Sequence, residues 1–154
     1  MLWILAPFSG RVVPLDEVPD PVFAGRMLGD GVAVDPEEGL AVAPVGGWVV
    51  VLHSASHAFA IETEEGVRVL VHIGLETVHL RGDGFERLVQ EGDRVESGQP
   101  IVRFDLERIR AAGYSLLSPV VLPDLSAGWE IRQTGLARVR AGRDPILMVQ
   151  RAGL

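Results

Sequence analysis

Residues 57–72 have the sequence HAFAIETEEGVRVLVH, in which two short apolar runs flank the turn residues 64–66. β-Branched and apolar side chains dominate both runs, so the stretch predicts a β-hairpin with strands over 57–61 and 67–73. With a two-residue loop, His57 faces His72 directly across the hairpin. A bulge at Gly66 would instead shift the register by one residue and put the two imidazoles on opposite faces. The shared face is the simpler pairing.

The rest of the chain continues this pattern outward from the hairpin. Apolar and polar residues alternate in short segments, and turn residues interrupt them every eight to twelve positions, as in all-β proteins. Further strands are expected at 47–52, 100–104, 138–139 and 146–150. One or two helical turns are expected at 84–90, and a short helix at 106–112 that Asp105 caps and Gly113 ends.

Two approximate internal repeats support a duplicated architecture. The pattern A-P-x-x-G-x-V occurs at 6–12 and again at 43–49, and 95–101 resembles 139–146 with one extra residue in the later copy. Glycines would supply the turn geometry, and each proline would begin a strand where its missing N–H is harmless. Paired units of this kind suit a closed β-sandwich that covers its own edges.

Composition excludes several function classes. A net charge of −7 over 154 residues argues against a general nucleic-acid binder, because neutralising phosphates requires a basic surface. The chain has no cysteine, which excludes disulfides, thiol catalysis and cysteine-based zinc sites. All 14 basic residues are arginine, so Schiff-base and P-loop lysines are excluded too. With no signal-peptide pattern and no long apolar run, we expect one cytoplasmic domain over 1–154.

The two histidines of the hairpin are the candidate reactive groups. His72 lies in an apolar strand, where a titratable imidazole is costly unless it has a partner or opens onto a site. An imidazole nitrogen is nucleophilic near neutral pH and can accept a phosphoryl group, which a neighbouring ring could stabilise by donating a hydrogen bond. The alternatives are a neutral core histidine, or a zinc ion held by His57 and His72 and completed by other ligands. No H-E-x-x-H element supports a self-contained zinc hydrolase.

The residues around His72 resemble a known family. The segment 66–80, GVRVLVHIGLETVHL, resembles the active-site motif of glucose-type enzyme IIA domains of the bacterial phosphoenolpyruvate-dependent sugar phosphotransferase system. Further matches occur in family order along nearly the whole chain, at 20–24, 29–31, 57–59, 82–85, 92–95 and 118–121.

This resemblance implies an all-β fold, an antiparallel barrel-sandwich with a duplicated motif and one or two short helices. It also implies a phosphotransferase component that accepts a phosphoryl group from the carrier protein HPr on Nε2 of His72. The group then passes to the IIB domain of a sugar permease, and His57 occupies the position of the second histidine that supports this transfer. No cofactor is required, and the chain is expected to be a free-standing carrier. Gly74 is expected to keep the rim of the site open.

The resemblance also implies a docking surface around the histidines. The family docks its partners through an apolar patch, whose positions hold Val22, Phe23, Met27, Leu28 and, beside His72, Leu70. Carboxylates would suit a charged rim facing a basic HPr and would raise the association rate more than the affinity; the candidates are Asp20, Glu62 and Glu76. An alternative function is a regulatory protein whose unphosphorylated form binds transporters or metabolic enzymes, and which phosphorylation switches off.

The sequence departs from the family at three positions near the histidines. Ala55 replaces a threonine whose hydroxyl joins the hydrogen bonds of the site. His53 replaces a residue that is commonly apolar, and His79 stands where a carboxylate is common. Both histidines are expected to be surface substitutions rather than new ligands.

Overall fold

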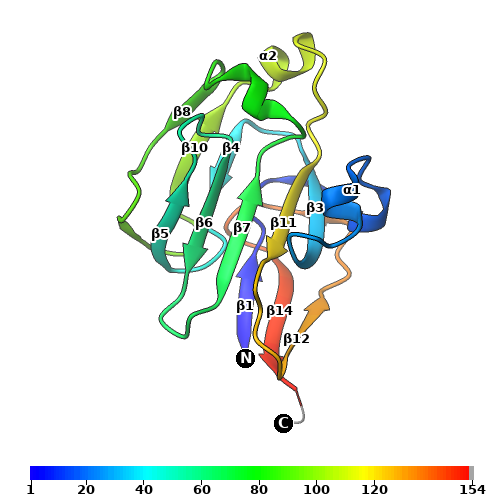
Figure 1. The fold of residues 1–154 in the computed structure, drawn as a ribbon, viewed down its shortest axis with the longest axis vertical. Helices are drawn as coiled ribbons and strands as arrows, with labels where there is room; N and C mark the ends of the chain where they lie inside the picture. Colours follow the sequence, from blue (N-terminus) through cyan, green and yellow to red (C-terminus); the bar gives the residue numbers. More distant parts are fainter. Residues whose placement is uncertain (153–154) are drawn as a thin grey trace.

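The computed structural model describes residues 1–152, which form short strands joined by turns, with two short helices (Figure 1). The first seven strands are β1 (Leu2–Leu5), β2 (Gly10–Pro14), β3 (Asp30–Pro36), β4 (Leu40–Val42), β5 (Gly47–Leu52), β6 (Ala58–Glu62) and β7 (Arg68–His72). The last seven are β8 (Phe85–Arg87), β9 (Arg94–Val95), β10 (Pro100–Phe104), β11 (Ser118–Leu122), β12 (Trp129–Gln133), β13 (Arg138–Val139) and β14 (Pro145–Arg151). The helices are α1 (Pro21–Ala24) and α2 (Leu106–Ala111), with single 3-10 turns at Leu15–Glu17 and Thr77–Leu80. No helix within residues 1–152 has the length and apolar character needed to cross a membrane.

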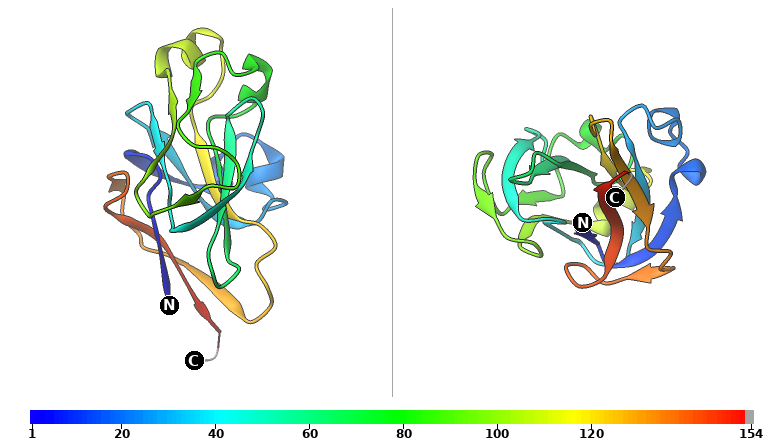
Figure 2. Two further views of the ribbon diagram at one scale, coloured as in Figure 1. Left: turned by 90° about the vertical axis from the view of Figure 1, so that its left-hand side faces the viewer. Right: turned by 90° about the horizontal axis from the view of Figure 1, so that it is seen from below.

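The strands form three antiparallel sheets. The largest has eight strands in the order β13-β2-β3-β11-β7-β6-β5-β9, and the other two have the orders β4-β10-β8 and β1-β14-β12. Viewed from below, the sheets lie on different sides of a shared interior, in a sandwich-like arrangement (Figure 2). This confirms the predicted all-β fold with short helices.

Side chains from all three sheets fill the interior. Along β7 the buried residues Val69 and Val71 alternate with half-exposed neighbours, as expected for a strand with one face on the core. Phe8 and Phe104 meet edge to face in this core, with 5.9 Å between ring centroids. A second, smaller cluster lies on the opposite face of the eight-stranded sheet and includes Phe23 of α1. The face of β7 that carries His72 therefore borders a small apolar cluster of its own.

The predicted internal duplication appears in the hydrogen bonds of the two A-P-x-x-G segments. The carbonyl of Ala6 accepts a bond from the N–H of Gly142, and the carbonyl of Ala43 accepts the equivalent bond from Gly98, both at 2.8 Å. The two glycines lie against each other, since a Cβ on Gly142 would come within 3.1 Å of the Gly98 Cα. The repeated segments are thus related in space as well as in sequence.

The glycine of the A-P-x-x-G pattern, Gly10 in the first copy and Gly47 in the second, has the same environment in both copies. A Cβ added to Gly10 would lie 2.0 Å from the Asp35 carbonyl oxygen, and one added to Gly47 would lie 2.0 Å from that of Glu62. Each glycine is therefore required because a backbone carbonyl of the antiparallel partner strand lies where its Cβ would be.

Most local predictions are confirmed, but two are wrong. Strands at 47–52, 100–104 and 138–139 have the predicted bounds, and Asp105 caps α2 by accepting a hydrogen bond from the Arg108 N–H. The helical turns expected at 84–90 are wrong, because Phe85–Arg87 is the strand β8. It pairs with β10, and this tertiary pairing overrides a segment too short to specify its own structure.

The predicted register of the central hairpin is also wrong. Ala58, not His57, pairs with His72, and Glu62 pairs with Arg68. The loop is longer than two residues because Gly66 adopts a left-handed φ of 86°. The hairpin therefore has the shifted register considered for a bulge at this glycine.

We predict that Gly47→Ala lowers the unfolding free energy by about 2 to 3 kcal/mol, because the new methyl group would overlap the Glu62 carbonyl. Gly46→Ala is the matched control, since its Cβ would meet only ordinary contacts at 3.6 Å or more, and it should change stability by less than about 0.5 kcal/mol. Urea denaturation measures both variants. Equal stability of the two variants would show that the Glu62 carbonyl does not exclude a side chain at position 47.

Candidate functional site

His72 lies at the end of β7, on the face of the sheet that points away from the main core. Its ring is half-buried, whereas the flanking Val71 and Ile73 are completely buried. The ring of Phe23 packs against it edge to face, with 5.1 Å between centroids. The sequence places a reactive imidazole here because the strand alternation turns it outward while its neighbours anchor the backbone.

One hydrogen bond determines the tautomer of His72. Its Nδ1 lies 2.6 Å from the carbonyl oxygen of Gly74. A carbonyl oxygen only accepts hydrogen bonds, so Nδ1 must carry the hydrogen. In the neutral ring Nε2 then holds the lone pair and is the nucleophilic nitrogen.

Gly74 is needed for this bond, which differs from the open-rim role expected from the sequence. It has a left-handed φ of 72°, and a Cβ would lie 2.7 Å from the Thr77 side chain and 2.8 Å from the Ser115 carbonyl oxygen. Its N–H donates to the Ser118 hydroxyl at 3.0 Å. The residue is thus packed tightly, in a conformation that turns its carbonyl back towards His72.

His57 reaches His72 through a turn rather than through the strand ladder. Ser56 has a left-handed φ of 65°, and its N–H donates to the His53 carbonyl at 2.7 Å. The His57 carbonyl accepts a bond from the Ile73 N–H at 2.7 Å, directly beyond the last ladder pair. The imidazoles of His57 and His72 therefore meet edge to face, with 4.9 Å between centroids. The predicted proximity of the two rings is correct, although its predicted cause is not.

Arg87 of β8 holds the turn that presents His57. Its guanidinium donates to the His53 carbonyl at 2.8 Å and to the Ser56 hydroxyl at 3.2 Å. Arg87 was not among the predicted site residues, because it lies 30 residues after His57 in a segment expected to be helical. Identifying Arg87 as a site residue would have required knowledge of the pairing of β8 with β10.

Both site histidines are neutral at pH 7. Burial, aided by the neighbouring His72 and His53, lowers the pKa of His57 to about 4. Burial also lowers the pKa of His72, while its bond to Gly74 and the carboxylate of Asp20 oppose that change. The lone pair on His72 Nε2 is therefore free to react near neutral pH.

The buried side of His57 has an unusual feature. Its Nδ1 is completely buried and forms no hydrogen bond with any described residue. The Ala55 side chain, at the departure from the family threonine, has no hydroxyl to offer, and the Ser56 hydroxyl is engaged by Arg87. Because the ring's remaining polar atom, Nε2, is not buried, we assign the hydrogen of neutral His57 to Nε2.

The structure gathers most predicted docking residues near His72. Asp20 caps α1 by accepting a hydrogen bond from the Val22 N–H at 2.9 Å, and both line a hollow of about 470 Å³ with Glu76. Exposed apolar side chains are present at Val22, Met27 and Leu28. Leu70 lies on the same face of β7 as His72 and is half-buried against the second apolar cluster.

Two predicted docking residues occupy other environments. Phe23 is buried, with 4% of its surface exposed, so it contacts His72 as a packing partner rather than as an open surface. Glu62 forms an ion pair with Arg68 at 3.1 Å. Arg68 is four residues before His72 on β7, a separation of roughly 13 Å, so Glu62 lies outside the immediate site.

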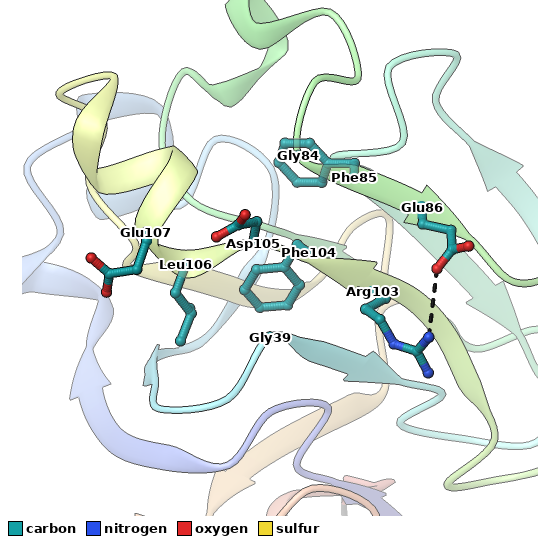
Figure 3. Close-up of a pocket in the computed structure, with 9 residues that line it drawn as sticks. All are labelled: Gly39, Gly84, Phe85, Glu86, Arg103, Phe104, Asp105, Leu106 and Glu107. Atoms are coloured by element: carbon teal, nitrogen blue, oxygen red, sulfur yellow. Dashed lines mark ion pairs between the residues drawn. The ribbon is translucent and has the colours of Figure 1, made fainter.

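A separate hollow of about 590 Å³ lies between β8, β10 and α2 (Figure 3). Apolar side chains of Phe85, Phe104 and Leu106 line it, and Glu86 and Arg103 form an ion pair at its edge. None of the four histidines lines this hollow. This hollow is therefore separate from the histidine pair.

The histidine pair alone offers two metal ligands. Among residues 1–152, no group of three or more histidine, cysteine or acidic side chains is arranged to hold a metal ion. Zinc at His57 and His72 stays a prediction that requires ligands from elsewhere.

Comparisons with known proteins agree with this geometry. Residues 2–127 match the family described as phosphoenolpyruvate-dependent sugar phosphotransferase system, EIIA 1. The chain is 46% identical to the glucose-specific EIIA component of Bacillus cereus, over 92% of this chain and 86% of the relative. It is 41% identical to the N-acetylglucosamine-specific EIICBA component of Escherichia coli, over 96% of this chain and 23% of that longer protein. Its structure resembles glucose permease IIA from Mycoplasma capricolum, with a TM-score of 0.89 and 38% identity over 95% of this chain and 94% of that one.

We predict that protonation of His57 destabilises the protein in acid. The unfolded chain binds this proton near pH 6.5, whereas the folded protein binds it near pH 4, so stability falls as pH drops through that window. The loss from this group should reach about 2 to 3 kcal/mol at pH 4. Urea denaturation at a series of pH values measures it.

In that experiment His57→Gln should flatten the pH dependence, while His79→Gln, at an exposed histidine, should retain it. Parallel pH profiles for wild type and His57→Gln would show that the imidazole of His57 is not held neutral by its burial.

Proposed function

The chain belongs to the EIIA 1 family of the phosphoenolpyruvate-dependent sugar phosphotransferase system, and we propose that His72 is the residue on which it carries the phosphoryl group. The chain is a phosphocarrier, a phosphotransferase component that relays a phosphoryl group for sugar uptake. The observation that supports His72 is its bond to Gly74, because this bond leaves Nε2 as a nucleophile.

The transfer chemistry follows from the fixed tautomer. The Nε2 lone pair of His72 attacks phosphorus, a new N–P bond forms, and the bond between phosphorus and the donor's nitrogen breaks. The Nδ1 hydrogen stays in its bond to the Gly74 carbonyl throughout, so no general base is needed. The phosphorylated ring then carries a positive charge, which makes His72 a good leaving group when the next acceptor attacks. The same hydrogen bond thus supports both acceptance and onward transfer.

His57 would stabilise the phosphoryl group during transfer. Its Nε2–H points to the accessible side of the ring pair, where it can donate to a phosphoryl oxygen. Because its pKa is low, His57 is a neutral donor at pH 7 and does not trap the dianion in a tight ion pair.

We propose HPr as the donor and a IIB domain as the acceptor. The Escherichia coli relative is named as an EIICBA component, a single protein that includes the A, B and C components, which supports IIB as the next carrier. The carboxylates of Asp20 and Glu76 beside His72 suit a basic donor surface, and the net charge of −7 would steer such a partner. Since phosphoenolpyruvate is made in the cytoplasm, we propose that the chain acts there. Glucose and N-acetylglucosamine appear in the names of the relatives, and the sugar relayed by this chain depends on its permease.

A second use of the same surface is regulatory. Val22, Met27 and Leu28 are exposed apolar side chains on and just after α1, whose Phe23 packs against His72, and a phosphoryl group on His72 would add charge on that side of the molecule. We propose that unphosphorylated protein binds regulatory targets more tightly than phosphorylated protein does. Recovery of purified candidate transporters on immobilised protein should fall on phosphorylation, and equal recovery in both states would exclude such a switch.

The primary prediction is phosphorylation of His72. Incubation with phosphoenolpyruvate, enzyme I and HPr should raise the intact mass by one phosphoryl group, about 80 Da. His72→Gln should show no gain, because it removes the nucleophilic nitrogen. A wild-type protein that stays at its original mass, or a gain that survives in His72→Gln, would refute the proposed role.

The matched variant is His57→Leu, which removes the neighbouring ring and its Nε2–H donor. It should still gain the phosphoryl group from HPr but should pass it to IIB at least about ten-fold more slowly, because a donor to the charged oxygens is lost. A normal rate of sugar phosphorylation with this variant would show that His57 does not support the transfer.

A further inference from the structure

His53 is a histidine of the site that the mechanism above does not use. It begins the turn that presents His57, and its carbonyl is one of the groups held by Arg87. Its ring is exposed and packs edge to face against His57, with 4.4 Å between centroids. The ring of His57 therefore packs against the imidazoles of both His53 and His72.

A backbone hydrogen bond fixes the tautomer of this third ring. The N–H of Ala55 lies 3.0 Å from His53 Nδ1. A backbone N–H only donates, so Nδ1 is the acceptor and the neutral ring carries its hydrogen on Nε2. Ala55 lacks the side-chain hydroxyl of the family threonine, but its backbone N–H orients the ring of His53. The Nε2–H of His53 is thus a different donor beside His57 and His72.

The surroundings of His53 suit an anionic group. His53 and Arg81 line a hollow of about 410 Å³ together with Ser54, Ala55, Val78 and His79, whose ring stacks with Tyr114, and no carboxylate lines this hollow. A positive charge on His53 would lower the pKa of both His57 and His72, which shows that its ring is electrostatically close to both. A dianionic phosphoryl group on His72 would therefore lie within the field of the His53 N–H dipole.

We propose that His53 is a third histidine of the phosphoryl site, whose Nε2–H donates a hydrogen bond to the phosphoryl group carried on His72. This inference rests on the proposed function of His72. The His53 donor stabilises the phosphorylated state, so it raises the equilibrium fraction of phosphorylated protein. It is not required for His72 to accept the phosphoryl group. It also takes over the role of the side-chain hydroxyl that Ala55 lacks.

The test compares wild type, His53→Leu and His53→Gln. Leucine removes the donor, whereas glutamine places an amide N–H near the position of the histidine Nε2. Each protein is mixed with a stoichiometric amount of phospho-HPr that has been freed of phosphoenolpyruvate and enzyme I, and the intact masses at equilibrium give the ratio of phosphorylated to free protein and of phosphorylated to free HPr. The equilibrium constant for transfer from HPr should fall about ten-fold in His53→Leu, as expected for a lost hydrogen bond to a charged group. In His53→Gln it should stay within about three-fold of wild type.

Controls separate this inference from the proposed function. His79→Leu removes another imidazole from the same hollow and should leave the equilibrium unchanged, because His79 contacts Tyr114 rather than the histidine pair. Thermal unfolding checks that the variants remain folded. An equilibrium constant in His53→Leu equal to that of wild type would overturn the role of His53 alone, and so would an equal loss in His53→Leu and His53→Gln. A wild-type protein that accepts no phosphoryl group would overturn both proposals.

Discussion

The hydrogen bond from His72 Nδ1 to the Gly74 carbonyl, 2.6 Å long, is the interaction on which the site depends. It requires the left-handed turn at Gly74, which the Ser118 hydroxyl stabilises from the neighbouring strand β11. The pairing of β7 with β11 therefore affects the reactivity of His72 Nε2. This pairing holds the backbone at Gly74, whose carbonyl keeps the ring hydrogen on Nδ1. Catalytic geometry and fold stability are therefore coupled at this point of the sheet.

A second constraint brings the remaining imidazoles to this nitrogen. The turn from His53 to Ser56 lies outside the strand ladder, and Arg87 holds its carbonyl and hydroxyl groups from another sheet. Burial then keeps His57 neutral, so that the ring can donate without forming an ion pair. The close approach of paired strands at Gly10 and Gly47 and the contact of Gly98 with Gly142 make the surrounding frame compact. A surface site of this kind holds its geometry without an enclosing cavity.

The sequence predicts what is determined locally or by the repeated motifs. The bounds of β5 and β10, the Asp105 cap and the duplicated A-P-x-x-G segments all follow from residue patterns. The register of the hairpin does not, because the conformation of Gly66 decides it and either loop length was compatible with the residues. The role of Arg87 depends on pairing between β8 and β10, which brings distant residues together. The proximity of His57 and His72 was predicted correctly but from the wrong register. Ala58 pairs with His72, and the turn before β6 brings the ring of His57 to that of His72.

The tautomer of His72 is the central claim, and a two-bond ¹H–¹⁵N correlation spectrum of ¹⁵N-histidine-labelled protein at pH 7.5 tests it most directly. The account predicts that His72 is neutral, with its hydrogen on Nδ1 and a lone pair on Nε2. A spectrum in which His72 carries the hydrogen on Nε2 would contradict it, because the nitrogen proposed to accept the phosphoryl group would then have no lone pair to offer.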